Sequence, residues 1–386
     1  MEDAASRVLG DDDLLIEILV RVGFPTTLVR TATVCTRWYL HASDRRFLRR
    51  FRDRHPSRLL GFYVLGYDCS VQTTRFVPML PQPQELAAVV RQVKSNFDAY
   101  RRVLRVPSYI FGCRNGRILL SEHDRLGVYN MLCPPATMCT TMFPPNPLPN
   151  LPEGAFYTYR ALLSKEEEEG RLMSYWYFFM HSTMEETFTV HVYMLQDGAW
   201  LVHNLAIDQI PRPPSQQEVV MVQDKIYMAA GQTDITVLDL TASSFSTIRL
   251  PKGVEHFEGS TRLSRANDSN SVYLLHLKEL QLRIWLHKGG TWSLLDNICL
   301  HDMRASLGMS DCNDLPQISM VGDNVEFVLL EMGRSILYLD VKYRTLRRVY
   351  ELANEDRSSL GYIQPFMMPW PPVFPALKNG SARNAI

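Results

Sequence analysis

"MVQDKIYM" (residues 221–228) returns in altered form as "MVGDNVEFV" (residues 320–328), and this echo marks a repeat in the β-rich part of the chain. In each repeat a strand-like segment ends near a large apolar residue, and a second large apolar residue follows about seven positions later. The pairs are Tyr193 and Trp200, Leu238 and Phe245, Trp285 and Trp292, and Tyr338 and Leu346. Their first members are 45, 47 and 53 residues apart. Periods of this length are typical of repeat architectures.

The repeat predicts a β-propeller. A fifth unit is visible in "NGRILLSEHDRLGVYN" (residues 115–130), and each unit reads as three or four short antiparallel strands joined by tight turns. One such sheet cannot cover both of its faces, so neighbouring sheets must stack and close into a ring. We expect five or six blades, with a sandwich or an irregular double sheet as the alternative. The apolar, proline-rich segment at 362–374 is compatible with an edge strand that helps to close the ring.

The first fifty-five residues differ from this pattern, because they read as helices. "DDDLLIEILVRVGFP" (residues 11–25) begins with three acids and stops at a glycine followed by a proline. On a helical wheel one arc holds Leu14, Leu15, Ile18, Leu19 and Val22, while Ile16 and Val20 fall outside it. A helical unit this small cannot bury so much apolar surface by itself. Either it docks on the β domain as a cap or another protein covers it.

The residues of this helical segment resemble the F-box, in particular that of plant F-box proteins in which a three-helix motif precedes a β-rich substrate domain. The resemblance is carried by Leu9, Asp12, Leu14, Glu17-Ile18-Leu19, Pro25, Leu28, Val34-Cys35, Trp38 and Phe47. Gly10 departs from the family pattern, which usually has proline there, so we expect a looser start of the contact helix and a modestly lower affinity for the adaptor. The segment at 349–372 also resembles the end of the associated domain in these plant proteins.

The expected organisation is therefore α+β and multidomain. It comprises a flexible tail at 1–8, a three-helix F-box at 9–55, a propeller-like substrate-recognition domain at 56–374 and a loose tail at 375–386. In the propeller, the loops after the second and fourth strands of each blade share one face, and such loops commonly bind partners. The candidates are residues 181–188, 206–218, 252–259 and 297–316.

The resemblance implies a function as the substrate-recognition subunit of an SCF-type cullin-RING ubiquitin ligase. The F-box would dock on the adaptor subunit, and through it on the cullin, while the β domain binds the protein to be ubiquitinated. The residues expected to make adaptor contacts or to support the contact surface are Leu9, Leu14, Ile18, Leu19, Val34 and Trp38. The alternative for Val34, Trp38 and Leu28 is that they form the core of the F-box.

Motifs of catalysis are missing from the sequence, so we expect no enzyme, no cofactor and no metal site. It lacks a phosphate-binding Gly-x-x-x-x-Gly-Lys loop, a Gly-x-Gly-x-x-Gly turn, a His-Glu-x-x-His helix and a Gly-x-Ser-x-Gly elbow. A propeller enzyme would need convergent carboxylates, which no motif places. A non-ligase F-box scaffold or a small-molecule sensor stays open as a second hypothesis.

Overall charge indicates no polyanionic partner, since 41 basic residues balance 41 acidic ones. A local basic run is formed by Arg45, Arg46, Arg49, Arg50, Arg52, Arg54 and Arg58. A solvated helix face or a contact with an acidic partner is favoured here over phosphate or RNA. The first residues do not read as a signal peptide, and no segment is long and apolar enough to span a bilayer. The expected location is intracellular, cytoplasmic or nuclear, with no membrane partner.

Overall fold

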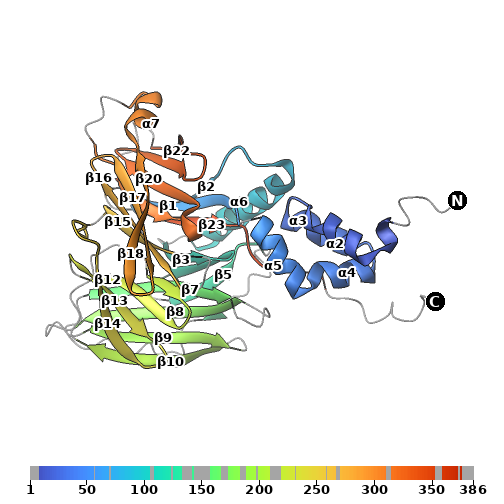
Figure 1. Cartoon of the computed structure of the whole chain (residues 1–386), viewed down its shortest axis with the longest axis horizontal. Coiled ribbons are helices and arrows are strands. Elements are labelled where there is room, and N and C mark those ends of the chain that lie inside the picture. The colour runs from blue at the N-terminus through green and yellow to red at the C-terminus, as the bar shows by residue number, and fades with distance from the viewer. Residues whose placement is uncertain are drawn as a thin grey trace.

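The computed structural model shows a helical unit attached to a ring of β-sheets (Figure 1). It describes residues 8–375 except 56, 69–70, 105–107, 123–124, 133–140, 143–156, 167–172, 183–187, 197–198, 209–218, 231, 258, 267–269, 310–313, 353–358 and 373. The helical unit contains α2 (Asp12–Val20), α3 (Pro25–Ala32), α4 (Thr36–Ser43) and α5 (Arg45–Arg54). Among the described residues of the ring, two α-helices accompany the strands: α6 (Gln84–Leu104) and α7 (His301–Ser306).

Side-chain caps mark the start of two helices of the helical unit, α2 and α5. Asp11 caps α2 by accepting hydrogen bonds from the backbone N–H groups of Asp13 and Leu14. Asp44 caps α5 through the N–H of Phe47 and separates it from α4. Pro25 occupies the first turn of α3, where its missing N–H leaves no hydrogen bond unmade. The stretch expected to form three helices contains α2 to α5 and, among its described residues, a further helical segment at 8–10; the Asp44 cap separates α5 from α4.

Five four-stranded antiparallel sheets follow one another along the chain, each in simple up-and-down order. Blade 1 comprises β3 (Ser108–Arg114), β4 (Arg117–Glu122), β5 (Arg125–Asn130) and β6 (Thr141–Met142). Blade 2 comprises β7 (Tyr157–Glu166), β8 (Met173–Ser182), β9 (Phe188–Gln196) and β10 (Ala199–Asp208). Blade 3 comprises β11 (Val220–Val222), β12 (Lys225–Ala230), β13 (Asp234–Asp239) and β14 (Ser244–Arg249).

The next two blades repeat this plan. Blade 4 comprises β15 (Thr261–Arg265), β16 (Val272–Lys278), β17 (Gln281–Lys288) and β18 (Thr291–Cys299). Blade 5 comprises β19 (Gln317–Val321), β20 (Phe327–Met332), β21 (Ser335–Asp340) and β22 (Thr345–Glu351), with a short 3₁₀ turn, η2 (Asp323–Val325), before β20. The residue pairs that predicted the repeat lie on the third and fourth strands of blades 2 to 5.

The two ends of the β region meet in a sixth, three-stranded sheet, which closes the ring. It has the order β2 (Val71–Pro78), β1 (Leu59–Asp68) and β23 (Ser359–Met367), with Phe62 of β1 paired to Pro365 of β23. The inner strands β3, β7, β11, β15, β19 and β23 each contact the next, and β23 contacts β3. The fold is therefore a β-propeller, and the C-terminal segment forms an edge strand that closes it.

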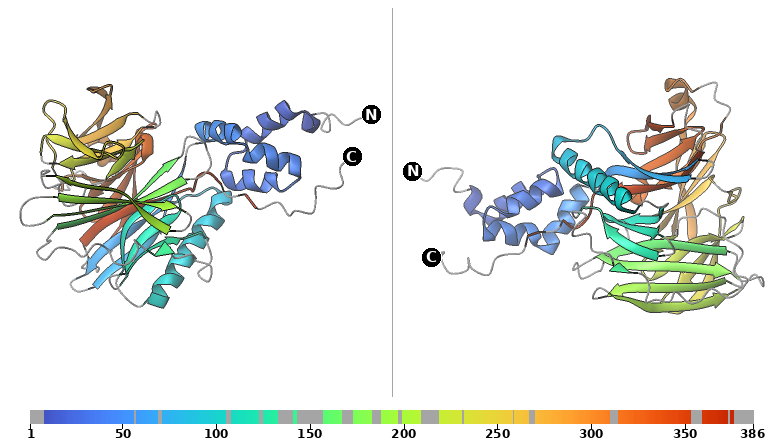
Figure 2. Two further views of the ribbon diagram at one scale, coloured as in Figure 1. Left: turned by 90° about the horizontal axis from the view of Figure 1, so that it is seen from below. Right: turned by 180° about the vertical axis from the view of Figure 1, so that it is seen from behind.

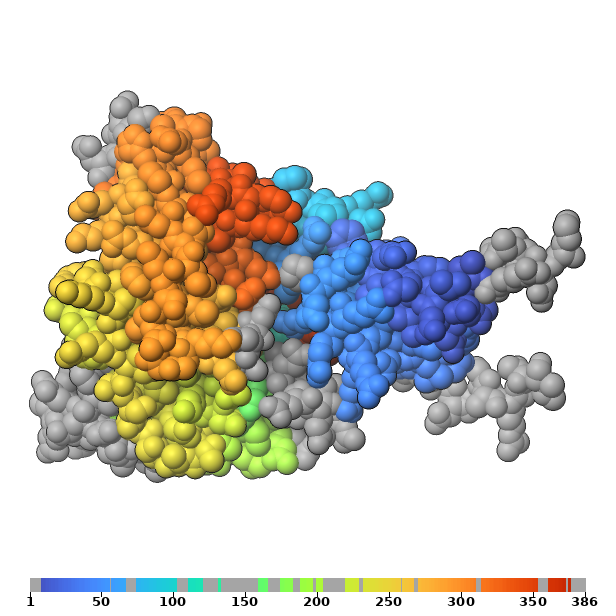
Figure 3. Space-filling model, in the orientation of Figure 1, coloured from blue at the N-terminus to red at the C-terminus, as the bar shows by residue number. Residues whose placement is uncertain are grey.

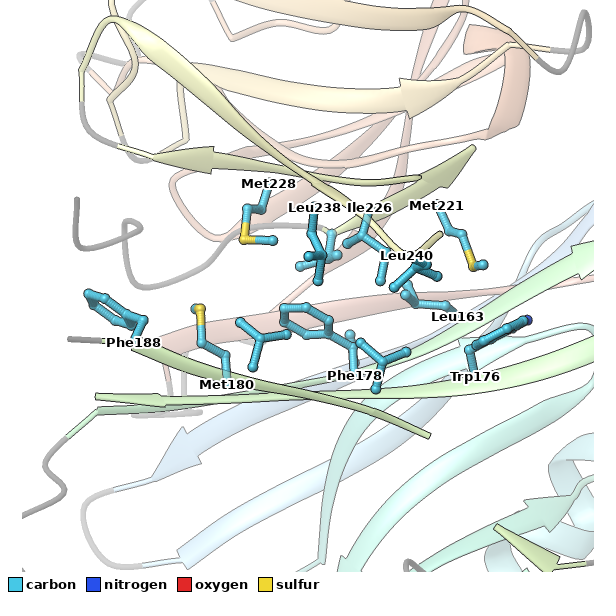
Figure 4. Close-up of a cluster of buried hydrophobic side chains, with 14 residues drawn as sticks. Leu163, Trp176, Phe178, Met180, Phe188, Met221, Ile226, Met228, Leu238 and Leu240 are labelled. Atoms are coloured by element: carbon cyan, nitrogen blue, oxygen red, sulfur yellow. The ribbon is translucent and has the colours of Figure 1, made fainter. Parts of the chain in front are cut away.

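Blades pack face to face through apolar side chains. Between blades 2 and 3, Phe178 and Met180 face Ile226, Met228 and Leu238 across a fully buried layer (Figure 4). The seam between the closing sheet and blade 1 is covered instead by α6, which lies along the outside of the ring (Figure 2). The side chains of α6 that pack into this seam follow helical spacing: Leu86, Val90, Val93, Phe97 and Tyr100.

Candidate functional site

The helical unit has its own apolar core and is not sealed inside the ring. Its buried residues come from all four helices: Leu15, Leu19, Val20, Leu28, Ala32, Ala42, Phe47 and Phe51. The space-filling view shows the unit projecting from the propeller (Figure 3). Contacts with the ring include those between α3 and α6 and those of the C-terminal segment, where Trp370 joins the core of the helical unit. The alternative of a cap buried against the propeller is therefore not what the structure shows.

Apolar side chains stay outside this core on the surface of the helical unit. Leu14 is 45% exposed and Ile18 is 38% exposed, one turn apart on α2. Val34, in the turn before α4, is 64% exposed, and Leu9 is 38% exposed. Because α2 buries Leu15 and Leu19 on one side, an ordinary amphipathic helix would carry polar residues at positions 14 and 18. This surface therefore has the composition of a helix that contacts something on two sides.

The remaining two predicted site residues lie deeper. Leu19 is fully buried, so it supports the surface from beneath and offers no atom to a partner. Trp38 on α4 is half-buried and packs against the core of the helical unit. Four of the six predicted residues are thus exposed, while Leu19 and Trp38 lie in or against the core of the helical unit. We refer below to Leu9, Leu14, Ile18 and Val34 as the exposed apolar set.

A polar clamp fixes the first turn of α2 against α4. The guanidinium of Arg37 donates to the Asp12 carboxylate at 2.7 Å and to the carbonyl of Gly10 at 2.8 Å. The same side chain donates to the carbonyl of Leu9, and His41 contacts Asp12 at 3.0 Å. Hydrogen bonds from Arg37 and His41 lower the pKa of Asp12. The clamp holds Leu9 next to the first turn of α4. Val34 lies just before this helix in the chain.

Gly10 has room for a side chain, because a Cβ added there meets no atom within 4 Å. The backbone near Gly10 is held by Arg37 through the carbonyls of Leu9 and Gly10. Arg37 thus restrains the segment that a proline stiffens in the family pattern.

Trp370 connects the two parts of the molecule. Its ring stacks on Phe51 of α5 with a centroid separation of 5.8 Å and an interplanar angle of 5°. Its backbone N–H donates to Oδ1 of Asn115, and Nδ2 of Asn115 donates to its carbonyl at 2.8 Å. Asn115 directly follows the inner strand β3. The segment after β23, which the sequence assigned to the β domain, thus contributes a core residue to the helical unit.

The same contacts show which face of the propeller carries the helical unit. Asn115 and Trp370 follow the last residues of the inner strands β3 and β23, so the helical unit lies where these strands end. Loops after the second and fourth strands of each blade lie at the opposite face. The four loops predicted to bind a partner are of this kind. Parts of them, namely 183–187, 209–218, 258 and 310–313, lie outside the described residues.

Comparison with known protein families assigns the β domain to one of them. The family model described as F-box protein AT5G49610-like, beta-propeller, matches residues 109–374. The chain belongs to this family. The match covers blades 1 to 5 and the closing strand β23, and it leaves the helical unit outside its range. No curated protein matches the chain in a search by similarity.

Solved structures resemble this F-box-protein propeller only weakly. A putative 6-phosphogluconolactonase from Bacteroides fragilis has 7% identity and a TM-score of 0.34, with 64% of this chain and 71% of that chain covered. One from Bacteroides uniformis has 9% identity and a TM-score of 0.33, with 78% and 81% covered. The WD40 domain of SCAP from fission yeast has 10% identity and a TM-score of 0.31, with 64% and 55% covered. Scores this low support no conclusion about function.

Within the described part of this F-box-family chain, no three His, Cys, Asp or Glu side chains lie close enough together to hold a metal ion. A membrane-spanning helix was also sought there, and none is long and apolar enough. The structure places His191 beside His181, with ring centroids 5.4 Å apart, and His203 beside Trp176.

The buried histidine pair His181 and His191 predicts acid sensitivity. Burial lowers the pKa of both, and that of His191 falls from 6.5 to about 4, with the charge of His181 as a second cause. Both are neutral at pH 7, and below about pH 6.5 the unfolded chain takes up a proton that the folded protein refuses. The free energy of unfolding should therefore fall as the pH is lowered from about 6.5 to 4. His191 contributes at most about 3 kcal/mol to this fall.

Urea unfolding as a function of pH measures this effect. His191→Gln should flatten the decline relative to the wild type, because the variant has one titrating group fewer. His203→Gln is the matched control, because it makes the same substitution at an exposed histidine outside the buried pair. Parallel profiles for His191→Gln and the wild type would show that the pair does not contribute.

Proposed function

We propose that this protein is the substrate-recognition subunit of an SCF-type cullin-RING ubiquitin ligase. The helical unit is taken to be an F-box that docks on the adaptor, and the adaptor links it to the cullin. The propeller is taken to bind the protein that is ubiquitinated. The subunit itself is proposed to be non-catalytic and to act in the cytoplasm, the nucleus or both.

The observation that carries the proposal is the exposed apolar set on a helical unit with a separate core. Leucine, isoleucine and valine side chains that stay in water cost free energy, and grouped apolar residues on a surface mark interaction sites. A helix face of this composition suits another apolar helix surface. Membership of an F-box protein family supports the same reading, because it supplies the expected partner class.

The arrangement of the two parts is consistent with a receptor. The helical unit sits at the face where the inner strands end, and the loops predicted to bind substrate lie at the other face. Adaptor and substrate would thus occupy opposite ends of the molecule without competing. The Trp370 connection would hold the two ends in a fixed relation, which suits a subunit that must present its substrate to a distant catalytic centre.

Co-purification tests the proposal and its alternative. The tagged full-length chain, expressed in cells, should bring down both the adaptor and the cullin. Adaptor without cullin would favour the non-ligase scaffold or sensor. Recovery of neither subunit would rule out the docking function.

A further inference from the structure

A cavity on the axis of the propeller lies at the face away from the helical unit. It has a volume of about 190 Å³ and is found among the inner strands, near their first residues. Two of the residues that line it, Gln317 and Tyr362, are exposed, so the cavity opens to solvent. It is named the axial pocket here. An engineered cavity of about 150 Å³ in another protein holds benzene, so the axial pocket has room for one aromatic ring.

Apolar side chains from several blades line the axial pocket. The buried aliphatic residues among them belong to the closing sheet and to blades 1, 2 and 5: Leu65, Ile110, Leu162, Ile318, Met320 and Ile363. A ring that enters among such side chains removes apolar surface from water on both sides, which is favourable. Because the walls come from different blades, closure of the propeller holds them apart, and the pocket is already formed without a guest.

The charged side chains of the walls are engaged by the protein itself. The guanidinium of Arg160 lies over two aromatic rings, at 5.4 and 5.6 Å from their centroids. Nη1 of Arg262 donates to a backbone carbonyl at 3.0 Å, and the positive charge of Arg114 acts on the carboxylate of Asp323. Burial raises the pKa of Glu331, which favours its neutral form. A neutral guest therefore suits the pocket better than a charged one.

Exposed apolar side chains lie near the mouth of the pocket. Phe257 is 52% exposed, Leu315 is 68% exposed, and Tyr362, which lines the pocket, is 41% exposed. The segments that carry Phe257 and Leu315 adjoin, because the N–H of Ile318 donates to the carbonyl of Gly259 at 2.6 Å. Both segments belong to loops that the sequence predicted to bind a partner. Grouped apolar residues on a surface mark interaction sites, and here they continue into a pocket.

We propose that the axial pocket takes one aromatic side chain of a bound protein segment, whose apolar neighbours lie on Phe257 and Leu315. An aromatic ring suits walls that hold guanidinium groups, because its face attracts cations and an aliphatic side chain gains nothing from them. The side-chain amides of Gln317 and Gln364 also line the pocket and can both donate and accept, as pairing with a peptide backbone requires. The assignment to a protein segment rests on the proposed function, whereas the preference of the pocket for an aromatic ring does not.

Amides of single amino acids test the pocket on the full-length protein. N-acetylphenylalaninamide should bind saturably in ligand-observed NMR, with a Kd of about 1 mM, as expected of so small a probe. The corresponding serine amide lacks the ring and should bind at least about tenfold more weakly, since burial of a phenyl ring is worth this much. The aspartate amide, which is anionic, should be equally weak. The proposal is overturned if either of these binds as well as the phenylalanine amide, or if the latter does not bind at about 10 mM.

Filling the pocket should abolish binding of this probe. Ser319→Phe adds a ring to the wall from blade 5 and takes the place of the guest. Ser319→Ala loses the hydroxyl, which contacts Glu331 at 3.5 Å, without adding volume, and it should bind as the wild type does. Ser293→Phe adds the same ring at an exposed position of β18 and should change nothing. Thermal melting checks that each variant is folded, and wild-type binding by a folded Ser319→Phe variant would disprove the pocket.

A measurement on the unaltered protein covers the case in which Ser319→Phe does not fold. With methyl-labelled protein, the ring of N-acetylphenylalaninamide should give nuclear Overhauser effects to the methyl groups of Ile110, Leu162 and Ile363, which line the pocket. Effects to other methyl groups alone would place the probe elsewhere and overturn the proposal.

A peptide separates a protein segment from a free aromatic molecule. A capped heptapeptide of sequence glycine-serine-leucine-phenylalanine-leucine-serine-glycine adds apolar flanks and should bind at least about tenfold more tightly than N-acetylphenylalaninamide. Leu315→Ser should reduce this gain and leave the small probe unaffected, whereas Leu201→Ser, at an exposed leucine of β10, should change neither. If the peptide binds no more tightly, the pocket takes a free aromatic molecule and the assignment to a protein segment is withdrawn.

Adaptor capture separates failure of the pocket from failure of the ligase proposal. The Ser319→Phe variant should capture the adaptor as the wild type does, because the pocket lies at the face away from the helical unit. Failure of the ligase proposal would appear instead as lost adaptor capture by the wild type, with binding of the small probe intact.

Discussion

Replacing Leu14 and Ile18 together with aspartate is expected to abolish adaptor capture while the propeller stays folded. Both side chains are substantially exposed, so the free protein gains two solvated carboxylates at little cost. In an apolar interface the same carboxylates would be buried without partners. Central interface residues each contribute about 2 to 4 kcal/mol, so the double variant should bind at least about a thousandfold more weakly.

Pull-down with the purified adaptor, followed by surface plasmon resonance, gives the size of the loss. Circular dichroism and thermal melting report whether the propeller is intact. Leu201→Asp is the matched control, because Leu201 is an exposed leucine on β10 of the propeller, and it should bind the adaptor normally. Capture of the adaptor at wild-type strength by the double variant would remove the exposed apolar set from the interface.

Local sequence patterns predicted the helical unit well because its helices are set by short-range rules. The apolar arc of α2 was visible in the sequence. The wheel could not separate Leu14 from Leu19, since both fall in one apolar arc. The separation depends on where α5 and the C-terminal segment pack, and that is tertiary information. A hydrophobic helix at a chain end predicts an interface but not which of its residues faces outward.

The repeat could be predicted for the same reason. The pairs on the third and fourth strands of blades 2 to 5 are close in sequence, and their hairpins form from local turns. The closing sheet was harder to predict from the sequence, because Leu59 pairs with Met367 at the other end of the β region. The sequence suggested that the C-terminal strand closes the ring, but it gave no register and no partner strand.

Trp370→Ala is expected to destabilise the helical unit strongly while leaving the blades in place. The indole is buried against Phe51 in a stacked arrangement, and Arg52 lies over it at 5.9 Å. Truncating a buried tryptophan typically costs about 3 to 5 kcal/mol. The two hydrogen bonds between Asn115 and Trp370 involve only the backbone at position 370, so alanine keeps them and loses the ring alone.

Hydrogen exchange separates this effect from global unfolding. Amides of α5 should exchange about a hundredfold faster or more in the alanine variant, which corresponds to a local loss of about 3 kcal/mol. Amides of β16 in blade 4 should be unaffected, because they lie far from Trp370 in the chain and in a different core. Trp370→Phe keeps an aromatic ring over Phe51 and should restore most of the protection. If α5 stays equally protected in the alanine variant, the helical unit is stable without the Trp370 ring. Another contact would then have to fix the helical unit relative to the propeller.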